Sequence, residues 1–461
     1  MKFYDRQQEL QDLKQIINRD SSDLVYISWR RRIWKTKLIL KVLEKEKFLY
    51  FFVWEKTKWE LLNDFTQIVQ QKLNLKYLKF QNFKEFFDFL FDFAQKGKLI
   101  LVFDEFQNFK NVDKTIFSDL QYLWDMYKDK ANIKMFCLWS HFTLMKEIFE
   151  NYSSPLYGRK TASFHLKAFD VNTQIEILRD FDLLNEKNLL YIFSIFAWIP
   201  KYLEIILQAN LDKNKLLDDI LNEYFRDNSF FINEWRELFA LEFGKSFEIY
   251  FSILTAIAVG KTKRWEIADF TGISNDSLGV YLQKLENYYE LIERKVPITE
   301  KKTSKNSRYQ IKDLFLKFWF RYVYKYDYLI EIGDFQQLKD IIKQDIETFL
   351  WFAFEELVKQ IIVAGNKLWK MPFKIEKIWT YFDRNWQNEI DIVCVNEKEK
   401  KVLFVECKLN IKKFSLKQLQ EKVEKTGIYK NYKKFYWVAS LDITKCKADW
   451  CLSLREVVED R

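Results

Sequence analysis

Ile27-Ser-Trp-Arg-Arg-Arg-Ile-Trp-Lys-Thr36 follows the apolar run Leu24-Val-Tyr-Ile27 and precedes a helical pattern. Lys35 and Thr36 end the pattern G-x-x-x-x-G-K-[ST], but Trp29 and Trp34 stand where that pattern has glycine. With glycine there, the stretch reads GRRRIGKT, a loop whose backbone N–H groups surround phosphates while the lysine neutralises them and the threonine holds Mg²⁺. The spacing predicts an ATP and Mg²⁺ site that comprises Trp29, Arg30, Arg31, Arg32, Ile33, Trp34, Lys35 and Thr36.

Both glycine positions require a positive φ and a close approach to the phosphates, which a side chain hinders. We therefore expect the indoles of Trp29 and Trp34 to obstruct the phosphate path. Three explanations stay open: a UGA codon that means glycine in the source organism and is translated here as tryptophan, a degenerate ATPase, and a chance match. The composition favours the first, because 9 glycines accompany 16 tryptophans. Ordinary usage of about 7% would give roughly 32 glycines.

Length and composition predict a multidomain globular chain, since 461 residues exceed the ~100–200 residues of one domain. The N-terminus has no apolar signal core, and no apolar stretch approaches the ~20 residues of a membrane helix. We expect a cytoplasmic protein with no membrane partner. The 5 cysteines are scattered, so we expect them to be reduced core residues. A net charge of +9 permits nucleic-acid binding without establishing it.

Hydrophobic periodicity divides the chain into four parts and predicts an α/β fold class. Apolar strands at 23–28, 48–53, 98–104 and 133–138 alternate with helical stretches, and one of these, Phe83–Phe93, is expected to face the core. The predicted domains are a P-loop α/β sheet at 1–167, a helical lid at 168–245, a winged helix-turn-helix at 246–328 and an α/β domain at 329–461. The family resemblance given below implies that the first is an AAA+-like ATPase and the last restriction-endonuclease-like.

Two carboxylates follow the third predicted strand, in Lys98-Leu-Ile-Leu-Val-Phe-Asp104-Glu105-Phe-Gln107. In P-loop enzymes the first such carboxylate supports Mg²⁺, and a second can polarise the attacking water. An apolar run that ends in Asp-Glu is more often a strand before a solvated turn. Its position about 70 residues after Thr36, in an α/β pattern, makes it a second part of the ATPase site.

The chain resembles the archaeal-type ATPases of the STAND/AAA+ group, which carry a nuclease-like C-terminal domain of unknown function. The resemblance covers nearly the whole chain and implies that Lys35, Thr36 and Asp104 bind phosphate and Mg²⁺ and that Glu105 is the catalytic base. It also implies that Ser140 is a sensor of the γ-phosphate and Arg159 a sensing or trans-acting arginine, although a turn serine and a solvated arginine are the plainer alternatives. Arg6 is assigned either to the nucleotide base or to a surface salt bridge.

The resemblance rests on matches spread along the chain: Phe3-Tyr-Asp-Arg6, WRRRIWKT, Phe103-Asp-Glu-Phe106, Leu138-Trp-Ser140, Ser154-Pro-Leu-Tyr-Gly158-Arg159 and Trp198-Ile-Pro-Lys-Tyr-Leu203. In the family pattern, further tryptophans of this chain would be glycine: Trp139, Trp198, Trp351, Trp379 and Trp386. Decay by mutation would not choose tryptophan repeatedly, so this favours the misread codon.

The third part reads as a helix, a turn at Gly272 and a second helix that Ser274 caps. Two strands follow, at 291–298 and 308–312, and enclose a loop with Lys301, Lys302 and Lys305. This predicts a winged helix with a basic wing. The module could contact DNA phosphates, or it could serve as a packing module of the ATPase.

The C-terminal part contains Asp391 in one apolar strand and Glu406-Cys407-Lys408 in the next, with a Lys/Glu turn between them. If the strands pair around that turn, the numbers of paired residues sum to about 797, which places Asp391 opposite Glu406 and Lys408 on the same face. Two carboxylates can bind Mg²⁺, and the lysine can act on a scissile phosphate. This resembles the PD-(D/E)xK nuclease core, with Glu355 or Glu356 as a further ligand, although a solvent-facing pair of charges is the simpler alternative.

The sequence therefore predicts an ATPase whose nucleotide state controls a winged helix and a nuclease-like domain, with ATP and DNA as partners and oligomerisation left open. The competing hypothesis is a non-catalytic DNA-binding or scaffold protein in which both sites are inert.

Overall fold

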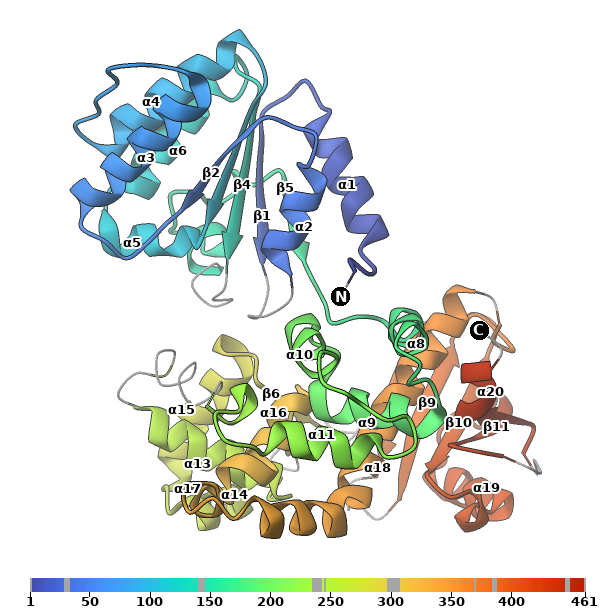
Figure 1. Ribbon diagram of the computed structural model, residues 1–461. Helices are drawn as coiled ribbons and strands as arrows, with labels where there is room; N and C mark the ends of the chain where they lie inside the picture. The colour runs from blue at the N-terminus through green and yellow to red at the C-terminus, as the bar shows by residue number, and fades with distance from the viewer. Residues whose placement is uncertain are drawn as a thin grey trace. The chain divides into compact units, whose positions relative to one another are not determined.

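The computed structural model describes residues 2–28, 34–139, 146–233, 243, 246–296, 307–368, 370–383, 388–443 and 448–459. The chain forms two compact units (Figure 1). The first unit comprises Met1–Ala168 with Ile199–Lys201, and the second comprises Phe169–Trp198 with Tyr202–Arg461.

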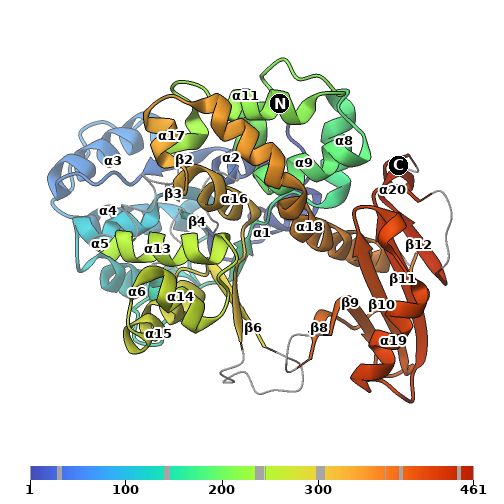
Figure 2. The ribbon, with the colours of Figure 1, turned by 90° about the horizontal axis from the view of Figure 1, so that it is seen from below.

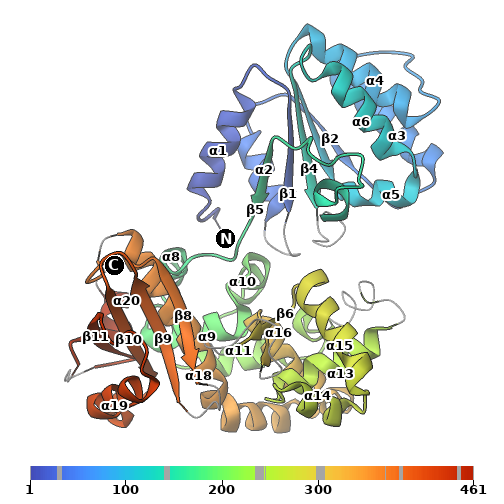
Figure 3. The same ribbon diagram turned by 180° about the vertical axis from the view of Figure 1, so that it is seen from behind.

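The first unit is a parallel sheet with helices on both faces. Its strands are β1 (Asp23–Ser28), β2 (Phe48–Phe52), β3 (Leu99–Asp104), β4 (Ile133–Trp139) and β5 (Ala162–His165), in the order β2-β3-β4-β1-β5. The helices α1 (Gln7–Ile17) and α2 (Lys35–Val42) lie on one face, and α3 (Lys58–Leu73), α4 (Phe83–Phe93), α5 (Phe109–Val112) and α6 (Ile116–Tyr127) lie on the other (Figures 1 and 3).

Apolar side chains on both faces account for this layering, because a parallel sheet is buried on both sides. Every residue of β3 and β4 is buried. Asn82 caps α4 by accepting a hydrogen bond from the Glu85 N–H, and Phe83, Phe86 and Leu90 of that helix are buried. The prediction that Phe83–Phe93 faces the core is confirmed. The sequence patterns missed β5, whose alternate residues are exposed.

The strand order places a switch point at the carboxyl edge of the sheet. The connection after β1 leads to β2, whereas the connection after β4 leads to β5 on the other side of β1. Ligands of open α/β sheets bind outside the carboxyl ends of strands at such a point. β1 ends at Ser28 and β4 ends at Trp139 at this edge, and residues 29–33 and 140–145 lie outside the described residues.

The second unit begins with a helical region and a helix-turn-helix. The described helices of these two regions are α8 (Val171–Asp180), α9 (Glu186–Phe196), α10 (Pro200–Ile206), α11 (Leu216–Tyr224), α13 (Phe247–Ala258), α14 (Arg264–Thr271) and α15 (Asn275–Gln283). The first residues of α10 belong to the first unit. Gly272 ends α14 at φ 68°, and Ser274 caps α15. The antiparallel strands β6 (Ile292–Lys295) and β7 (Arg308–Ile311) follow as the wing. Lys301, Lys302 and Lys305 lie outside the described residues.

A long helix connects this region to the C-terminal sheet. After α16 (Leu314–Phe318) and α17 (Asp327–Glu331), α18 runs from Phe335 to Lys367 and contacts β9 and β10. Arg321 holds Asp345 of α18 through two hydrogen bonds of 2.6 and 2.9 Å and donates a third, of 3.1 Å, to the Ala258 carbonyl at the end of α13. These contacts fix α18 relative to the helix-turn-helix.

The C-terminal sheet is mixed. Its strands are β8 (Lys377–Phe382), β9 (Glu389–Asn396), β10 (Lys401–Lys408), β11 (Lys433–Ser440) and β12 (Trp450–Ser453), in the order β12-β11-β10-β9-β8 (Figure 2). The pairs β8–β9 and β9–β10 are antiparallel, and β10–β11 and β11–β12 are parallel. The helix α19 (Leu416–Thr426) packs Leu419 and Val423 on the sheet, and α20 (Leu454–Glu459) ends the described chain.

The described residues also bear on the predictions about membrane-spanning helices and about the cysteines. No single helix there is long and apolar enough to cross a membrane, although α9 and α10, bent by 119°, reach the length and composition as a pair. Cys137, Cys394 and Cys407 are free and buried. Cys451 is disulfide-bonded, so the prediction that all cysteines are reduced core residues is wrong for this one, which lies partly exposed on the edge strand β12.

Candidate functional site

The carboxyl edge of the first sheet brings four predicted site residues together. Lys35 and Thr36 begin α2, while Asp104 ends β3 and Glu105 follows it. The Thr36 hydroxyl donates a 2.9 Å hydrogen bond to Asp104 Oδ2, and Lys35 Nζ lies 3.7 Å from Glu105 Oε1. A hydroxyl, a carboxylate and an ammonium group on adjacent elements are the donor set that Mg²⁺ and a polyphosphate require.

Tyr50 is a member of this site that the sequence analysis did not identify. Its hydroxyl donates a 2.6 Å hydrogen bond to the same Asp104 Oδ2, and the Glu105 N–H donates to Oδ1 at 3.0 Å. Burial, together with the Asp104 carboxylate, raises the pKa of Tyr50, so its hydroxyl remains a donor near neutral pH. Its place near the carboxyl end of β2, beside β3, was the signal that could have revealed it.

The Glu105 side chain is oriented by its neighbours. Its backbone takes the left-handed conformation, with φ 56°, and Gln107 Nε2 donates a hydrogen bond to Oε2. Gln107 Oε1 is buried and has no hydrogen-bond partner in the described part of the chain. Such an outlier backbone is commonly retained at functional sites. The arrangement leaves Glu105 between the Lys35 ammonium and a buried amide.

The C-terminal sheet pairs the second predicted set of residues as expected. The numbers of paired residues in β9 and β10 sum to 797 throughout, as in Lys401 with Asn396 and Val405 with Ile392. The predicted register is therefore confirmed for these five pairs, and the last of them, Val405 with Ile392, directly adjoins Glu406 and Asp391 in the chain. Asp391 Oδ2 accepts a 2.7 Å hydrogen bond from the Cys407 N–H, next to Glu406 in the chain.

Glu406 binds two lysines. Lys408 Nζ lies 2.8 Å from Glu406 Oε1, and Lys422 of α19 lies 3.0 Å from the same oxygen. Asp391 is almost fully buried, and this burial, with the neighbouring Glu406 carboxylate, raises the pKa of Asp391 to about 7. Two carboxylates and two ammonium groups are thus gathered at the carboxyl end of β10.

The long helix α18 adds a third carboxylate. Glu355 is 8% exposed, and its Oε1 has no hydrogen-bond partner among the described residues, whereas Glu356 is exposed. Burial raises the pKa of Glu355 to about 8, and Asp391 contributes to this shift. Glu355 and Glu356 were the two residues predicted as a further metal ligand, and Glu355 is the one whose side chain is buried. Among the described residues, no three His, Cys, Asp or Glu side chains are grouped closely enough to hold a metal ion.

Comparison with known proteins agrees with this organisation. Residues 3–206 match an ATPase domain found predominantly in Archaea, and residues 319–423 match a domain of archaeal and bacterial proteins of unknown function. An uncharacterized protein of Methanocaldococcus jannaschii is 32% identical over 456 residues, which cover 98% of each chain. The chain belongs to this family of archaeal-type ATPases. Nucleotide binding follows from its ATPase domain.

Solved structures are similar to this chain over about two thirds to three quarters of its length. A Walker-type ATPase of Pyrococcus abyssi is 21% identical, with a TM-score of 0.52 over 68% of this chain and 95% of that chain. The ORC2 protein of Aeropyrum pernix is 14% identical, with a TM-score of 0.40 over 74% of this chain and 95% of that chain. The first similarity supports the ATPase fold.

Trp34 directly precedes α2, and its backbone conformation and indole contacts are described. Its backbone has φ 47°, the conformation that the glycine of this archaeal-type ATPase motif would adopt. The indole stacks on Phe3 with 5.8 Å between ring centroids, and Lys37 Nζ lies 4.4 Å from its ring centre. Stacking and cation–π attraction hold the indole on the face of α2 that carries Lys37. Residues 29–33 of the phosphate loop lie outside the described residues, so the expected obstruction of the phosphate path stays a prediction. Trp29, Arg30, Arg31, Arg32, Ile33 and Ser140 lie outside the described residues.

The two arginines have structural partners. Arg159 forms an ion pair of 2.6 Å with Asp125 of α6 and donates to the carbonyls of Pro155 and Tyr157. None of these groups belongs to the nucleotide site. Arg6 is buried, lies 3.2 Å from Glu9 and donates to the Lys167 carbonyl. Arg6 therefore forms a salt bridge, as one of the two alternatives expected, but the arginine is buried and does not lie on the surface.

Proposed function

We propose that this archaeal-type ATPase hydrolyses ATP at the carboxyl edge of its first sheet and acts as a nucleotide-dependent switch of the STAND/AAA+ kind. The convergence of Lys35, Thr36, Asp104 and Glu105 carries the proposal. Lys35 would neutralise the phosphates, Thr36 and Asp104 would hold Mg²⁺, and Glu105 would take the proton of the attacking water. Bound Mg²⁺ would supply neutralisation of the phosphate charge.

The test compares variants in a chain that carries Trp29→Gly and Trp34→Gly. Lys35→Ala should abolish ATP binding, because the phosphates lose their counter-charge. Glu105→Gln should retain binding and lower turnover by about 10²-fold or more, as expected for a lost general base. Glu44→Gln, an exposed glutamate just after α2, is the matched control and should change neither. Unchanged turnover in Glu105→Gln would refute the assigned base and direct attention to Gln107.

We propose a second activity, metal-dependent cleavage of nucleic-acid phosphodiesters, at a PD-(D/E)xK-like centre. The observation that favours it is the pairing of β9 with β10, which gathers Asp391, Glu406 and Lys408. The carboxylates would hold a divalent ion, and the ammonium group of Lys408 would stabilise the charge that develops on the scissile phosphate. Glu355 could complete the ligands after a small rearrangement, since its Oε1 is unpartnered among the described residues.

Calorimetry with Mg²⁺ or Mn²⁺ and cleavage assays on DNA and RNA, with and without ATP, test this centre. Asp391→Ala should lose both metal binding and cleavage. Lys408→Ala should still bind the metal but lose cleavage, because the lysine acts on the phosphate. A chain that binds no metal and cleaves no substrate would favour the scaffold alternative.

We place contact with DNA on the wing and the C-terminal domain. The exposed residues of α15 include the uncharged Asn275 and Ser277 and the acidic Asp276, and the basic Lys284 follows the helix. The negative charge of Asp276 and the positive charge of Lys284 balance each other. A helix without net charge attracts phosphates weakly.

The cytoplasm is the compartment that fits an ATP-dependent switch of this kind.

A further inference from the structure

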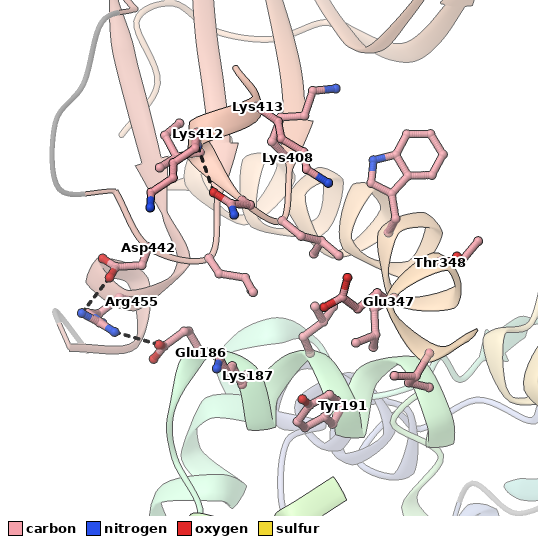
Figure 4. Close-up of a pocket in the computed structure, with 18 of the residues that line it drawn as sticks. Glu186, Lys187, Tyr191, Glu347, Thr348, Lys408, Lys412, Lys413, Asp442 and Arg455 are labelled. Atoms are coloured by element: carbon pink, nitrogen blue, oxygen red, sulfur yellow. Dashed lines mark hydrogen bonds and ion pairs between the residues drawn. The ribbon is translucent and has the colours of Figure 1, made fainter. Parts of the chain in front are cut away.

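A large pocket adjoins the carboxylate and lysine centre of the second unit. Its volume is about 1040 Å³, at the upper end of the ~300–1,000 Å³ typical of ligand sites. The helices α9 and α18 form one side, and Lys408 with the following residues to Lys413 forms another (Figure 4). Leu441 and Asp442 after β11, and Arg455 of α20, complete the lining. The pocket thus opens at the carboxyl ends of the parallel strands β10 and β11.

The pocket has an excess of free positive charge. Arg455 binds two of the lining acids, Glu186 at 3.0 Å and Asp442 at 2.9 Å (Figure 4). Lys187, Lys412 and Lys413 line the pocket and form no ion pair within the described residues, and Lys408 reaches it from the centre itself. The lining as a whole has more bases than acids, since Lys187, Lys343, Lys408, Lys412, Lys413 and Arg455 stand against Glu186, Glu347 and Asp442, so its net charge is positive.

The lining also offers surfaces for flat rings. Tyr191 of α9 lines the pocket beside the apolar side chains of Leu190 and Leu350. Trp351 of α18 also lines it, but it is one of the tryptophans that are glycine in the family pattern, so the stacking surface is assigned to Tyr191 alone. A cationic groove with aromatic side chains is the arrangement with which proteins bind single-stranded nucleic acid, because lysines follow the phosphates while bases stack. Helices on one side and strand ends on the other enclose the space, which suits one strand better than a rigid duplex.

We propose that this pocket binds a single strand of nucleic acid and leads its phosphate backbone to Lys408. The proposal rests on the nuclease-like centre proposed above, since Lys408 belongs to both. It adds the form of the substrate and the residues that hold it: Lys187 from the helical region, and Lys412 with Lys413 from the loop after β10.

The test measures binding of the full chain to fluorescently labelled single-stranded 12-mers of DNA and RNA, by anisotropy in EDTA, so that neither metal nor cleavage is needed. Lys412→Glu with Lys413→Glu should weaken binding at least tenfold and should lower the slope of log K against log salt by about 1.4, the value expected for two lost phosphate contacts. Lys187→Glu should weaken binding as well. Lys417→Glu with Lys425→Glu, two exposed positions of α19, makes the same change of charge outside the pocket and should have little effect.

Equal binding by the pocket variants and the α19 control would overturn the proposal, as would tighter binding of a duplex of the same length. Displacement of the strand by ATP or inorganic phosphate at matched phosphate concentration would show a small-anion site and would also overturn it. Strand binding that depends on the pocket lysines, in a chain that cleaves nothing with Mg²⁺ or Mn²⁺, would support the pocket while refuting the nuclease-like activity.

Discussion

Individual tryptophans carry physical signs of positions made for glycine. Trp34 and Trp198 have φ of 47° and 53°, which bulky residues adopt only at a cost. The indole N–H groups of Trp139, Trp198 and Trp379 are buried without a hydrogen-bond partner in the described part of the chain. Trp319, in contrast, donates to the Ile232 carbonyl at 3.1 Å, as buried tryptophans usually do.

Sequencing of the source gene separates these classes. We expect UGA at the positions of Trp29, Trp34, Trp139, Trp198 and Trp379. Trp34, Trp139, Trp198 and Trp379 show a positive φ or a buried N–H without a partner among the described residues, and the phosphate loop requires glycine at position 29. Trp319 should be encoded by UGG. UGG at every one of these positions would refute the misread codon and favour a degenerate ATPase.

The hydrogen bond between Tyr50 and Asp104 gives a prediction about stability. Tyr50→Phe should lower the free energy of unfolding by about 1–2 kcal/mol, because the buried Asp104 carboxylate loses a donor. Denaturant unfolding monitored by circular dichroism provides the measurement. Tyr77→Phe removes a hydroxyl from an exposed residue and should leave stability unchanged. Equal stability of the two variants would show that the hydrogen bond contributes nothing net.

Among the secondary-structure elements, α18 places the buried carboxyl group of Glu355 beside the C-terminal sheet, and this group holds its proton to an unusually high pH. The pKa of Glu355 is raised from 4.5 to about 8, so between these values the folded chain retains a proton that the unfolded chain has lost. Stability must then fall as pH rises through this window and level off above it, because the folded state binds more protons.

Glu355→Gln should remove this contribution to the slope. The variant should match the parent near pH 5 and exceed it near pH 8, when denaturant unfolding is measured at intervals between those values. Glu331→Gln, at an exposed position, is the control and should keep the parent slope. A Glu355→Gln profile parallel to that of the parent would contradict the buried proton.

Local patterns determine how much of these elements the sequence could predict. The register of β9 and β10 was predictable because both strands are apolar and a short turn joins them, so few pairings were compatible. The short edge strand β5 was missed because its alternate exposed residues give a weak signal over four positions. The pocket was not predictable, since Lys187, Glu347, Lys412 and Arg455 meet only through tertiary packing.

At the scale of the whole molecule, two units with separate cores predict separate unfolding. The Phe-rich core of the first unit and the core between α19 and the last sheet share no residue. In a chain with glycine at positions 29 and 34, calorimetry should show two transitions. ATP with Mg²⁺ at about 100 times Kd should stabilise the first unit by about 2.7 kcal/mol and leave the second unchanged.

The control for this experiment is Lys35→Ala, in which ATP should move neither transition. A single-stranded 12-mer should raise only the transition of the second unit. One cooperative transition that moves as a whole with either ligand would contradict thermal independence.

The unbroken length of α18 has an evolutionary consequence. Within its 33 residues, Asp345 is held by Arg321, Trp351 lines the pocket, and Glu355 reaches the carboxylate centre. One inserted residue between Asp345 and Glu355 would turn everything beyond it by about 100° and advance it by about 1.5 Å, which would separate these contacts. Descendants of a common ancestor can therefore exchange amino acids along this helix, but insertions and deletions should accumulate in turns such as 427–432, where a change of length does not rotate a helix or shift the β9–β10 register.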